Sequence, residues 1–444
     1  MDIVKMFLSR DDNSRASAGK NETITRFKKK KQKRFLSDTM LNLHQKLMLE
    51  MPHLKLSYSL FCRTKPFWIV APNTNNRETC VCKLHDNAQM KADRLKHLGI
   101  INSPSLSKVA EELCCDTQAK ACMYRECLSC KNKSLSHTTS TGTSGTEVTW
   151  WYQWFTKKED YEKEKDGERE KITVTKTVKQ RCEGSPEHLL EDFEREMKAK
   201  VCKHLFNIHH QYTQLQSLHR SLKEDEAILH IDYAENWQCK YAKEVQQVHF
   251  GASHRQTTLH NAVVHTKDCT LTFCALSPSM KHDPPAIWAQ LEPVLQFLKE
   301  NHAKIQKLFF ISDRPTMQYR GKNFYLLSTI PFQMGFTAVN WSFLEAGHGK
   351  GPADGVGATM KRTADSQVAR GTDIPTAKAL YDTLLPLTKV KLLYMEEDQI
   401  NRVSTLLPKE LTTIKGTLSI HQVICTTPGT IHYRVLSCFC NKNI

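Results

Sequence analysis

The sequence predicts an α/β protein whose main domain is a mixed β-sheet flanked by helices. Three observations support this fold class. From residue 227 onward, short apolar segments typical of buried strands alternate with segments of helical apolar spacing. Hydrophobic residues make up 40% of the 444 residues, which is enough for a buried core. A cysteine-rich region between residues 80 and 130 predicts a separate, small zinc-binding module.

The charge of the chain indicates a polyanionic partner. Lysine and arginine number 63 against 47 acidic residues, which gives a net charge of +16. Nucleic acid is the first partner class that such a charge indicates and a membrane surface the second, so we expect DNA; a basic protein without a polyanionic partner is the alternative. No run of about 18 apolar residues occurs, so we expect neither a membrane span nor a membrane partner. Segment 1–20 lacks the apolar core of a signal peptide, and the predicted location is the nucleus. A homo-oligomer is compatible with the sequence, which does not specify one.

Residues 1–37 predict a basic, largely disordered arm. Its centre carries a dense run of cations that is typical of a nuclear-import signal or of a segment that contacts DNA phosphates. An ordinary solvated charge run is the alternative. The candidate nucleic-acid-binding residues are Lys28, Lys29, Lys30, Lys31, Lys33 and Arg34.

Residues 38–133 predict a zinc-binding Cys/His-rich module. In a reducing compartment cysteines are thiols or metal ligands, and two short ligand clusters separated by a few tens of residues are typical of tetrahedral Zn²⁺ sites. Buried reduced thiols are the alternative. For a single ion we favour Cys82, His85, Cys127 and Cys130, with Cys80, Cys115 and Cys122 serving a second site or remaining free.

The remaining chain divides by composition. Residues 134–186 predict a linker followed by a charged insertion, and residues 187–224 predict a helical region. The main α/β core is expected at 225–385, and residues 386–444 are expected to form a C-terminal extension with a truncated Cys motif.

Within the core, the elements follow in the order strand, strand, strand, helix, strand, helix, strand, helix. Each strand is a short apolar or alternating run, and the second and third are expected to form a hairpin. Two prolines mark the start of the first helix. The predicted ranges are 227–232, 257–264, 269–276, 285–301, 307–313, 323–330, 336–344 and 358–370.

Acids lie at the ends of the first and fourth of these strands. This order predicts a ribonuclease-H-like mixed sheet with flanking helices, in which the first and fourth strands are neighbours, so Asp232 and Asp313 can meet. Asp354, near the start of the last helix, is the preferred third acid; Glu345 is the alternative and Asp365 a weaker one. Phosphodiester cleavage with two divalent ions requires such carboxylates, with Mg²⁺ or Mn²⁺ as the expected ions. A turn or helix cap is the alternative role for each acid alone.

A glycine-rich turn, 346–351, precedes the last helix. It does not match the G-x-x-x-x-G-K-[ST] spacing of a nucleotide-binding loop. His348 and Lys350 are therefore predicted to contact a nucleic-acid backbone, and a plain tight turn is the alternative.

Several stretches carry a resemblance to a known family. They are DYAEN at 232–236, EVQQVHF at 244–250, ISDRPTMQY at 311–319, and WSFLEAGHGKGPADG at 341–355 with Lys361 and Arg362. The segment 230–384 resembles eukaryotic transposon-derived proteins with a DDE/DDD, ribonuclease-H-like integrase core. This resemblance implies that Asp232, Asp313 and Asp354 are metal-binding acids of a transposase. It extends more loosely to the N-terminal cysteines and to the SCFC stretch at 437–440.

Two departures from that family leave two hypotheses open. Arg314 follows the second acid, where the family has glycine, and the chain ends shortly after the SCFC stretch, before further cysteines of the family. The first hypothesis is a DDD-type transposase that cleaves and transfers DNA strands with Mg²⁺ or Mn²⁺. The second is a non-catalytic, domesticated nuclear zinc protein that binds DNA or protein.

Overall fold

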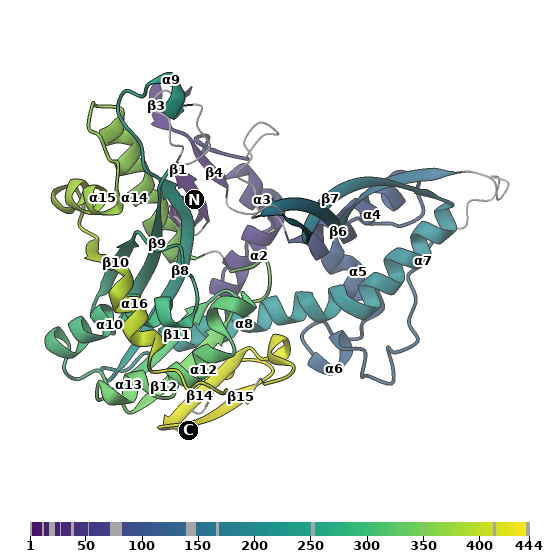
Figure 1. Ribbon diagram of the computed structural model, residues 1–444. Coiled ribbons are helices and arrows are strands. Elements are labelled where there is room, and N and C mark those ends of the chain that lie inside the picture. Colours follow the sequence, from purple (N-terminus) through teal and green to yellow (C-terminus); the bar gives the residue numbers. More distant parts are fainter. Residues whose placement is uncertain are drawn as a thin grey trace. The chain divides into compact units, whose positions relative to one another are not determined.

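The chain is described here from a computed structural model (Figure 1). The described residues are 2–10, 13–16, 23–26, 28–36, 40–51, 53–71, 82–138, 148–165, 168–249, 254–349, 351–411 and 414–440. The chain divides into two compact units: unit 1 comprises Met1–Cys80 and His210–Ile444, and unit 2 comprises Val81–His209. None of the helices in the described ranges has the length and apolarity that a membrane crossing requires.

Unit 1 is built on one large mixed β-sheet. Its strands are β8 (Glu226–Gln238), β9 (Gln256–His265), β10 (Thr270–Ser277), β11 (Lys307–Ser312), β12 (Ala338–Phe343), β13 (Lys391–Tyr394), β14 (Gln422–Thr427) and β15 (Thr430–Arg434). They lie in the order β13-β10-β9-β8-β11-β12-β14-β15. The pairs β8–β11, β11–β12 and β10–β13 are parallel, and the other neighbours are antiparallel.

Helices cover both faces of this sheet (Figure 1). On one face α10 (Pro284–Asn301), α12 (Lys322–Leu327) and α16 (Glu397–Ser404) bury their apolar sides against the alternate strand residues. On the other face lie α14 (Pro352–Val368), α15 (Ala377–Leu384) and the C-terminal half of α8 (Cys202–Arg220). Successive side chains of the strands point to opposite faces of the sheet, so both faces contribute to an apolar layer beneath the helices. The short helices of this unit are α9 (Gln246–His249), α11 (Thr316–Tyr319), α13 (Ile330–Gln333), η2 (Leu385–Leu387) and η3 (Thr417–Ser419).

The N-terminal part of unit 1 has its own small core. Its elements are α1 (Asp2–Ser9), β1 (Ser14–Ala16), β2 (Thr23–Arg26), β3 (Lys29–Gln32), β4 (Arg34–Leu36), α2 (Met40–Glu50), α3 (Tyr58–Arg63) and β5 (Ile69–Val70). Phe7 and Leu8 of α1 pack with Leu47 of α2 and Phe61 of α3. The prediction that residues 1–37 are largely disordered was therefore wrong for the described residues, because α1 and β4 contribute apolar side chains that a shared core buries.

Unit 2 combines helices with a long hairpin. Its elements are α4 (Lys83–His97), α5 (Leu106–Leu113), α6 (Lys120–Met123), β6 (Thr149–Lys165), β7 (Glu168–Gly184), α7 (Pro186–Glu196), a π-turn at η1 (Met197–Val201) and the first turns of α8. Strands β6 and β7 pair antiparallel along their whole length. The charged insertion is thus a β-hairpin, and most of residues 187–224 lie in α7, η1 and α8.

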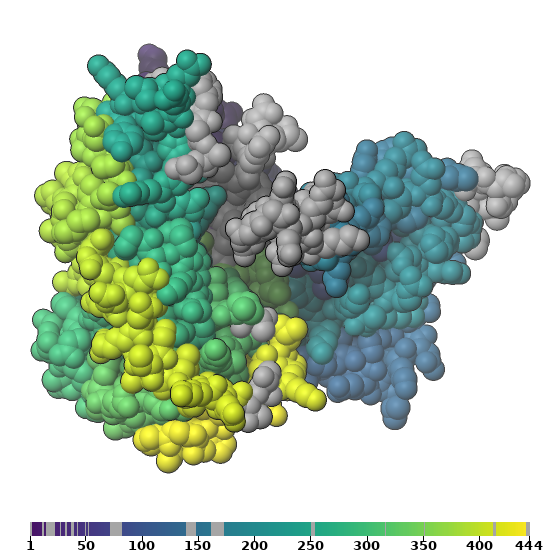
Figure 2. Space-filling model, in the orientation of Figure 1, coloured from purple at the N-terminus to yellow at the C-terminus, as the bar shows by residue number. Residues whose placement is uncertain are grey.

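The structure confirms the predicted α/β protein with a large mixed sheet and flanking helices. It corrects the predicted C-terminal boundary of the core. The predicted strands at 227–232, 257–264, 269–276 and 307–313 correspond to β8, β9, β10 and β11. The boundary at 385 was wrong, because β13, β14 and β15 from the expected extension are strands of the same sheet. Figure 2 shows this C-terminal part, coloured towards yellow, at the surface beside the green elements of unit 1.

We predict that Trp341→Ala strongly destabilises unit 1. The Trp341 side chain is fully buried, stacks on Phe310 at 4.8 Å, and donates from Nε1 to Ser312 Oγ at 2.9 Å. Its loss leaves a cavity, and the expected cost in unfolding free energy is about 3–5 kcal/mol. Urea denaturation measures this cost. Met317→Ala, at a residue that is 84% exposed, serves as the control with an expected change below about 0.5 kcal/mol.

Candidate functional site

Two of the predicted catalytic acids lie side by side on neighbouring strands. β8 and β11 pair in parallel, with Ile311 opposite His230. Continuing this register by two residues brings Asp313, directly after β11, opposite Asp232. Residues two apart along a strand point to the same face, so both carboxylates project from the face that α14 and α8 cover. We had expected Asp232 at the end of its strand. Because β8 continues to Gln238, Asp232 instead lies within the strand.

The third acid, Asp354, reaches this group from the first turn of α14. Its carboxylate accepts a hydrogen bond from the backbone N–H of Gly351 at 2.8 Å, which caps the helix. The turn before α14 packs directly on the sheet. A Cβ atom added at Gly349 would lie 2.5 Å from Asp313 Cβ, and one added at Gly351 would overlap the His230 ring. Glycine at these two positions therefore permits the close approach that brings Asp354 to the other acids.

Burial and mutual repulsion raise the pKa values of Asp232 and Asp313. Burial, followed by the charges of Asp354 and Asp313, raises the pKa of Asp232 to about 9. Burial, followed by the charge of Asp354, raises the pKa of Asp313 to about 6. Asp313 Oδ1 is buried without a hydrogen-bond partner among the described residues. Hard divalent cations take carboxylate oxygens as ligands, so a cation bound between these acids would offset this repulsion.

A fourth polar residue, Asn261, borders the acids and was missed in the sequence. It lies opposite Asp232 in the antiparallel pairing of β9 with β8. Its side chain is fully buried, and in the described part of the chain neither amide atom has a hydrogen-bond partner. A Cβ atom added at Gly357 of α14 would lie 2.7 Å from Asn261 Nδ2. An asparagine inside a predicted strand was the only signal in the sequence.

Glu345, the alternative third acid, is engaged elsewhere. Its carboxylate forms an ion pair with Arg314 Nη1 at 3.0 Å and lies 2.7 Å from His421 Nε2. Arg314 also donates to the backbone carbonyl of Leu418. The side chain of Arg314 is thus directed towards Glu345 and the segment before β14, although its backbone follows Asp313 immediately.

Asp365, the weaker alternative, lies later in α14 and has its own partners. It accepts hydrogen bonds from Trp237 Nε1 at 3.0 Å and from Lys240 Nζ at 2.7 Å. These contacts join α14 to the end of β8 and the segment that follows it.

The predicted nucleic-acid contacts lie in two places of unit 1. Lys28 to Lys31 are exposed on the β2–β3 hairpin, and Lys31 Nζ lies 5.9 Å from the centre of the Trp68 ring. Lys33 is half-buried, and Arg34 donates from Nε to Ser14 Oγ at 2.9 Å. The backbone carbonyl of His348 accepts a hydrogen bond from Tyr212 Oη at 3.2 Å. Lys350 lies outside the described residues.

Four of the predicted cysteine ligands of unit 2 converge. The sulfur atoms of Cys115, Cys122, Cys127 and Cys130 all lie within 4.8 Å of one another, and this group could hold a metal ion such as zinc. Hydrogen bonds from the backbone of Cys130, followed by its side chain, lower the pKa of Cys127 to about 7. A lowered thiol pKa favours the thiolate, which is the form that binds metal.

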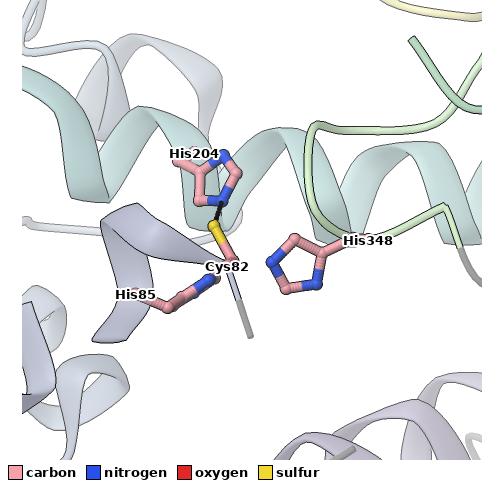
Figure 3. Close-up of side chains that lie close together, drawn as sticks. All are labelled: Cys82, His85, His204 and His348. Carbon is pink, nitrogen blue, oxygen red and sulfur yellow. Dashed lines mark hydrogen bonds between the residues drawn. The ribbon is translucent and has the colours of Figure 1, made fainter. Parts of the chain in front are cut away.

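The ligand set favoured for a single ion was wrong, because its four members belong to two different groups. Cys127 and Cys130 join Cys115 and Cys122, whereas Cys82 and His85 lie beside His204 (Figure 3). Their donor atoms lie within 4.8 Å of one another, and Cys82 Sγ is 3.3 Å from His204 Nε2. His204 was missed because it is far along the chain from His85 and shows no metal-binding spacing. Cys80 lies outside the described residues.

Comparison with known proteins gives two matches, both to families without an assigned function. A family model described as domain of unknown function (DUF8701) matches residues 211–437, slightly more than half of the chain. A second, described as domain of unknown function (DUF8699), matches residues 1–73. No curated protein and no solved structure matches the chain.

We predict that Asp232→Asn changes how stability depends on pH. A carboxyl whose pKa rises from 3.8 to about 9 on folding keeps a proton that the unfolded chain releases, so the free energy of unfolding falls as pH rises through that window. The amide removes this loss. The difference in unfolding free energy between the variant and the wild type should therefore be at least about 1 kcal/mol more favourable to the variant at pH 8 than at pH 5.

Urea denaturation at both pH values without added Mg²⁺ measures this difference. Glu235→Gln, at a side chain that is 92% exposed, is the control and should follow the wild type. Equal pH dependence in Asp232→Asn and the wild type would show that Asp232 ionises normally in the folded protein.

Proposed function

This chain belongs to the family described as domain of unknown function (DUF8701), and we propose that it is a transposase-derived protein that binds DNA and cleaves or transfers DNA strands with divalent metal ions. The observation that carries this proposal is the convergence of Asp232, Asp313 and Asp354 at one face of the sheet. The proposed location is the nucleus and the proposed partner is DNA.

The strand order supports a ribonuclease-H-like core. In such a fold three antiparallel strands are followed by two parallel ones, with the first strand at the centre beside the fourth. The order β10-β9-β8-β11-β12 follows this pattern, with β10–β9 and β9–β8 antiparallel and β8–β11 and β11–β12 parallel. The acids then lie on the first strand, after the fourth strand, and on the helix after the fifth, as expected for a DDD-type site.

The acids would act by holding divalent cations at the sheet face. When bound, such ions activate the attacking oxygen and stabilise the leaving oxygen of a phosphodiester. The chain contributes uncompensated carboxylates: Asp313 Oδ1 has no other partner among the described residues, and Asp232 must release a proton that repulsion and burial retain. Asp354 keeps its place through the Gly351 N–H. Buried apolar clusters of α14 and α8 on this face limit the access of water.

The orientation of Arg314 bears on the question of activity. A guanidinium beside a metal-binding acid would compete with the ion if it paired with Asp313. Arg314 pairs instead with Glu345, which leaves the Asp313 carboxylate to other ligands. This geometry favours the catalytic hypothesis over the non-catalytic one.

DNA binding would come from basic and zinc-organised parts of the chain. The net charge of +16 and the exposed lysines of the β2–β3 hairpin fit a phosphate backbone. The Cys115, Cys122, Cys127 and Cys130 group, with zinc as the proposed ion, would organise the loop around α6. The same features would suffice for a non-catalytic zinc protein that binds DNA or protein, which is the second candidate.

We predict that the purified protein nicks supercoiled plasmid DNA in Mg²⁺ or Mn²⁺. Asp232→Asn and Asp313→Asn should each lower the nicking rate at least about 100-fold, because each removes a negatively charged oxygen ligand of the ions. Gel conversion of supercoiled to open-circular DNA measures the rate. Glu235→Gln is the matched carboxyl-to-amide control and should keep the wild-type rate.

Measuring DNA binding by the same variants shows whether a loss of nicking comes from the active site or from loss of folding. The variants should bind DNA with the salt dependence of the wild type, measured by fluorescence anisotropy. A wild-type protein that binds DNA but never nicks it with either ion would refute the catalytic proposal and leave the non-catalytic candidate.

We predict that Arg314→Gly does not create activity and lowers stability. Glu345 is only 8% exposed, so removing its guanidinium partner leaves a buried charge and should cost about 1–3 kcal/mol. Nicking and urea denaturation are measured together. A glycine variant that gains cleavage over an inactive wild type would instead identify this chain as an enzyme inactivated at that position.

A further inference from the structure

We propose that unit 2 carries a second metal site, formed by Cys82, His85 and His204 and separate from the four-cysteine group. The ligand class is a borderline divalent ion, with Zn²⁺ as the expected occupant. One thiolate and two imidazoles form a nitrogen–sulfur donor set, which suits zinc and not the hard cations Mg²⁺ or Ca²⁺. The site does not depend on the function proposed above.

Two of the donors are aligned by the start of α4. Cys82 is the N-cap residue of this helix and His85 lies in its first turn. Residues three apart on a helix face the same side, so the thiol and the imidazole are presented together. The N-terminus of a helix also favours the thiolate form of a cysteine placed there.

The third donor comes from α8, directly after a π-turn. His204 lies in the first turn of α8, and Met197–Val201 before it form the π-turn η1. A π-turn adds a residue to the helical repeat and rotates the residues that follow it, and such turns occur frequently at functional sites. His204 is 6% exposed, which shows that its imidazole is directed into the protein.

The separation of one donor pair suits a tetrahedral zinc ion, and the third donor lies close to that pair. Zn–S and Zn–N bonds of about 2.3 and 2.1 Å place neighbouring donor atoms roughly 3.3–3.8 Å apart. Cys82 Sγ and His204 Nε2 are 3.3 Å apart, and the rings of His85 and His204 have centroids 4.9 Å apart (Figure 3). Three donors leave the fourth position of the ion to water or to a further ligand.

Buried ion pairs hold α4 in place for this site. Lys91 Nζ contacts Asp192 Oδ2 at 2.5 Å and Glu196 Oε2 at 2.7 Å on α7, and its side chain is only 2% exposed. Because α7 continues through η1 into α8, the same contacts fix the helix that carries His204. The donors are therefore preorganised, and zinc would join residues that are 122 positions apart in the sequence.

The test counts zinc in the purified full-length protein by inductively coupled plasma mass spectrometry. We expect two equivalents in the wild type and one in His204→Ala. The double variant Cys127→Ala/Cys130→Ala removes the ion of the four-cysteine group and should also retain one equivalent, bound at the second site. His97→Ala, at an exposed histidine of the same helix as His85, is the control and should retain two.

A second variant protects the test against loss of folding. His204→Cys supplies another zinc ligand and should restore the second equivalent, whereas a purely structural role of the histidine would not predict this rescue. Two equivalents in His204→Ala, or a single wild-type equivalent that disappears only with Cys127 and Cys130, would overturn the proposal.

Discussion

Repulsion among three carboxyl groups at one face of a buried sheet is the constraint on which the rest of unit 1 depends. Asp232 lies within β8, and Asp313 follows β11 directly, so the parallel pairing of these strands holds the two acids close together. Asp354 arrives on a helix whose preceding turn requires glycine to approach the strands. Folding therefore raises the pKa of Asp232 and Asp313, and a bound cation would offset the cost of ionising them.

In unit 2, polar and metal-ligating side chains connect the elements. Its helices α5 and α6 are short, and its hairpin has no further strand in the described residues to pair with. Buried Lys91 with two acids, and the donors Cys82, His85 and His204, join segments that are distant in the sequence. Small modules with limited apolar cores commonly rely on metal ligands for such cross-links.

The sequence was informative where one segment contains the whole signal. The strands at Asp232 and before Asp313 were found because a strand needs only a short apolar run. Cys115, Cys122, Cys127 and Cys130 were recognised as candidate ligands from their local spacing, but the sequence did not group them correctly. His204 and Asn261 were not identified, since their partners are set by tertiary packing and by strand pairing. The helix at residues 2–9 was missed because an eight-residue helix depends on a core that residues farther along the chain complete.

The C-terminal strands have a practical consequence for any shorter version of this protein. A fragment ending near residue 385 would contain the three acids yet lack β13, β14 and β15. The backbone N–H and C=O groups of β10 and β12 would then face solvent along two open sheet edges. Open edges of this kind associate with other chains, so such a fragment would be prone to aggregate before its chemistry could be studied.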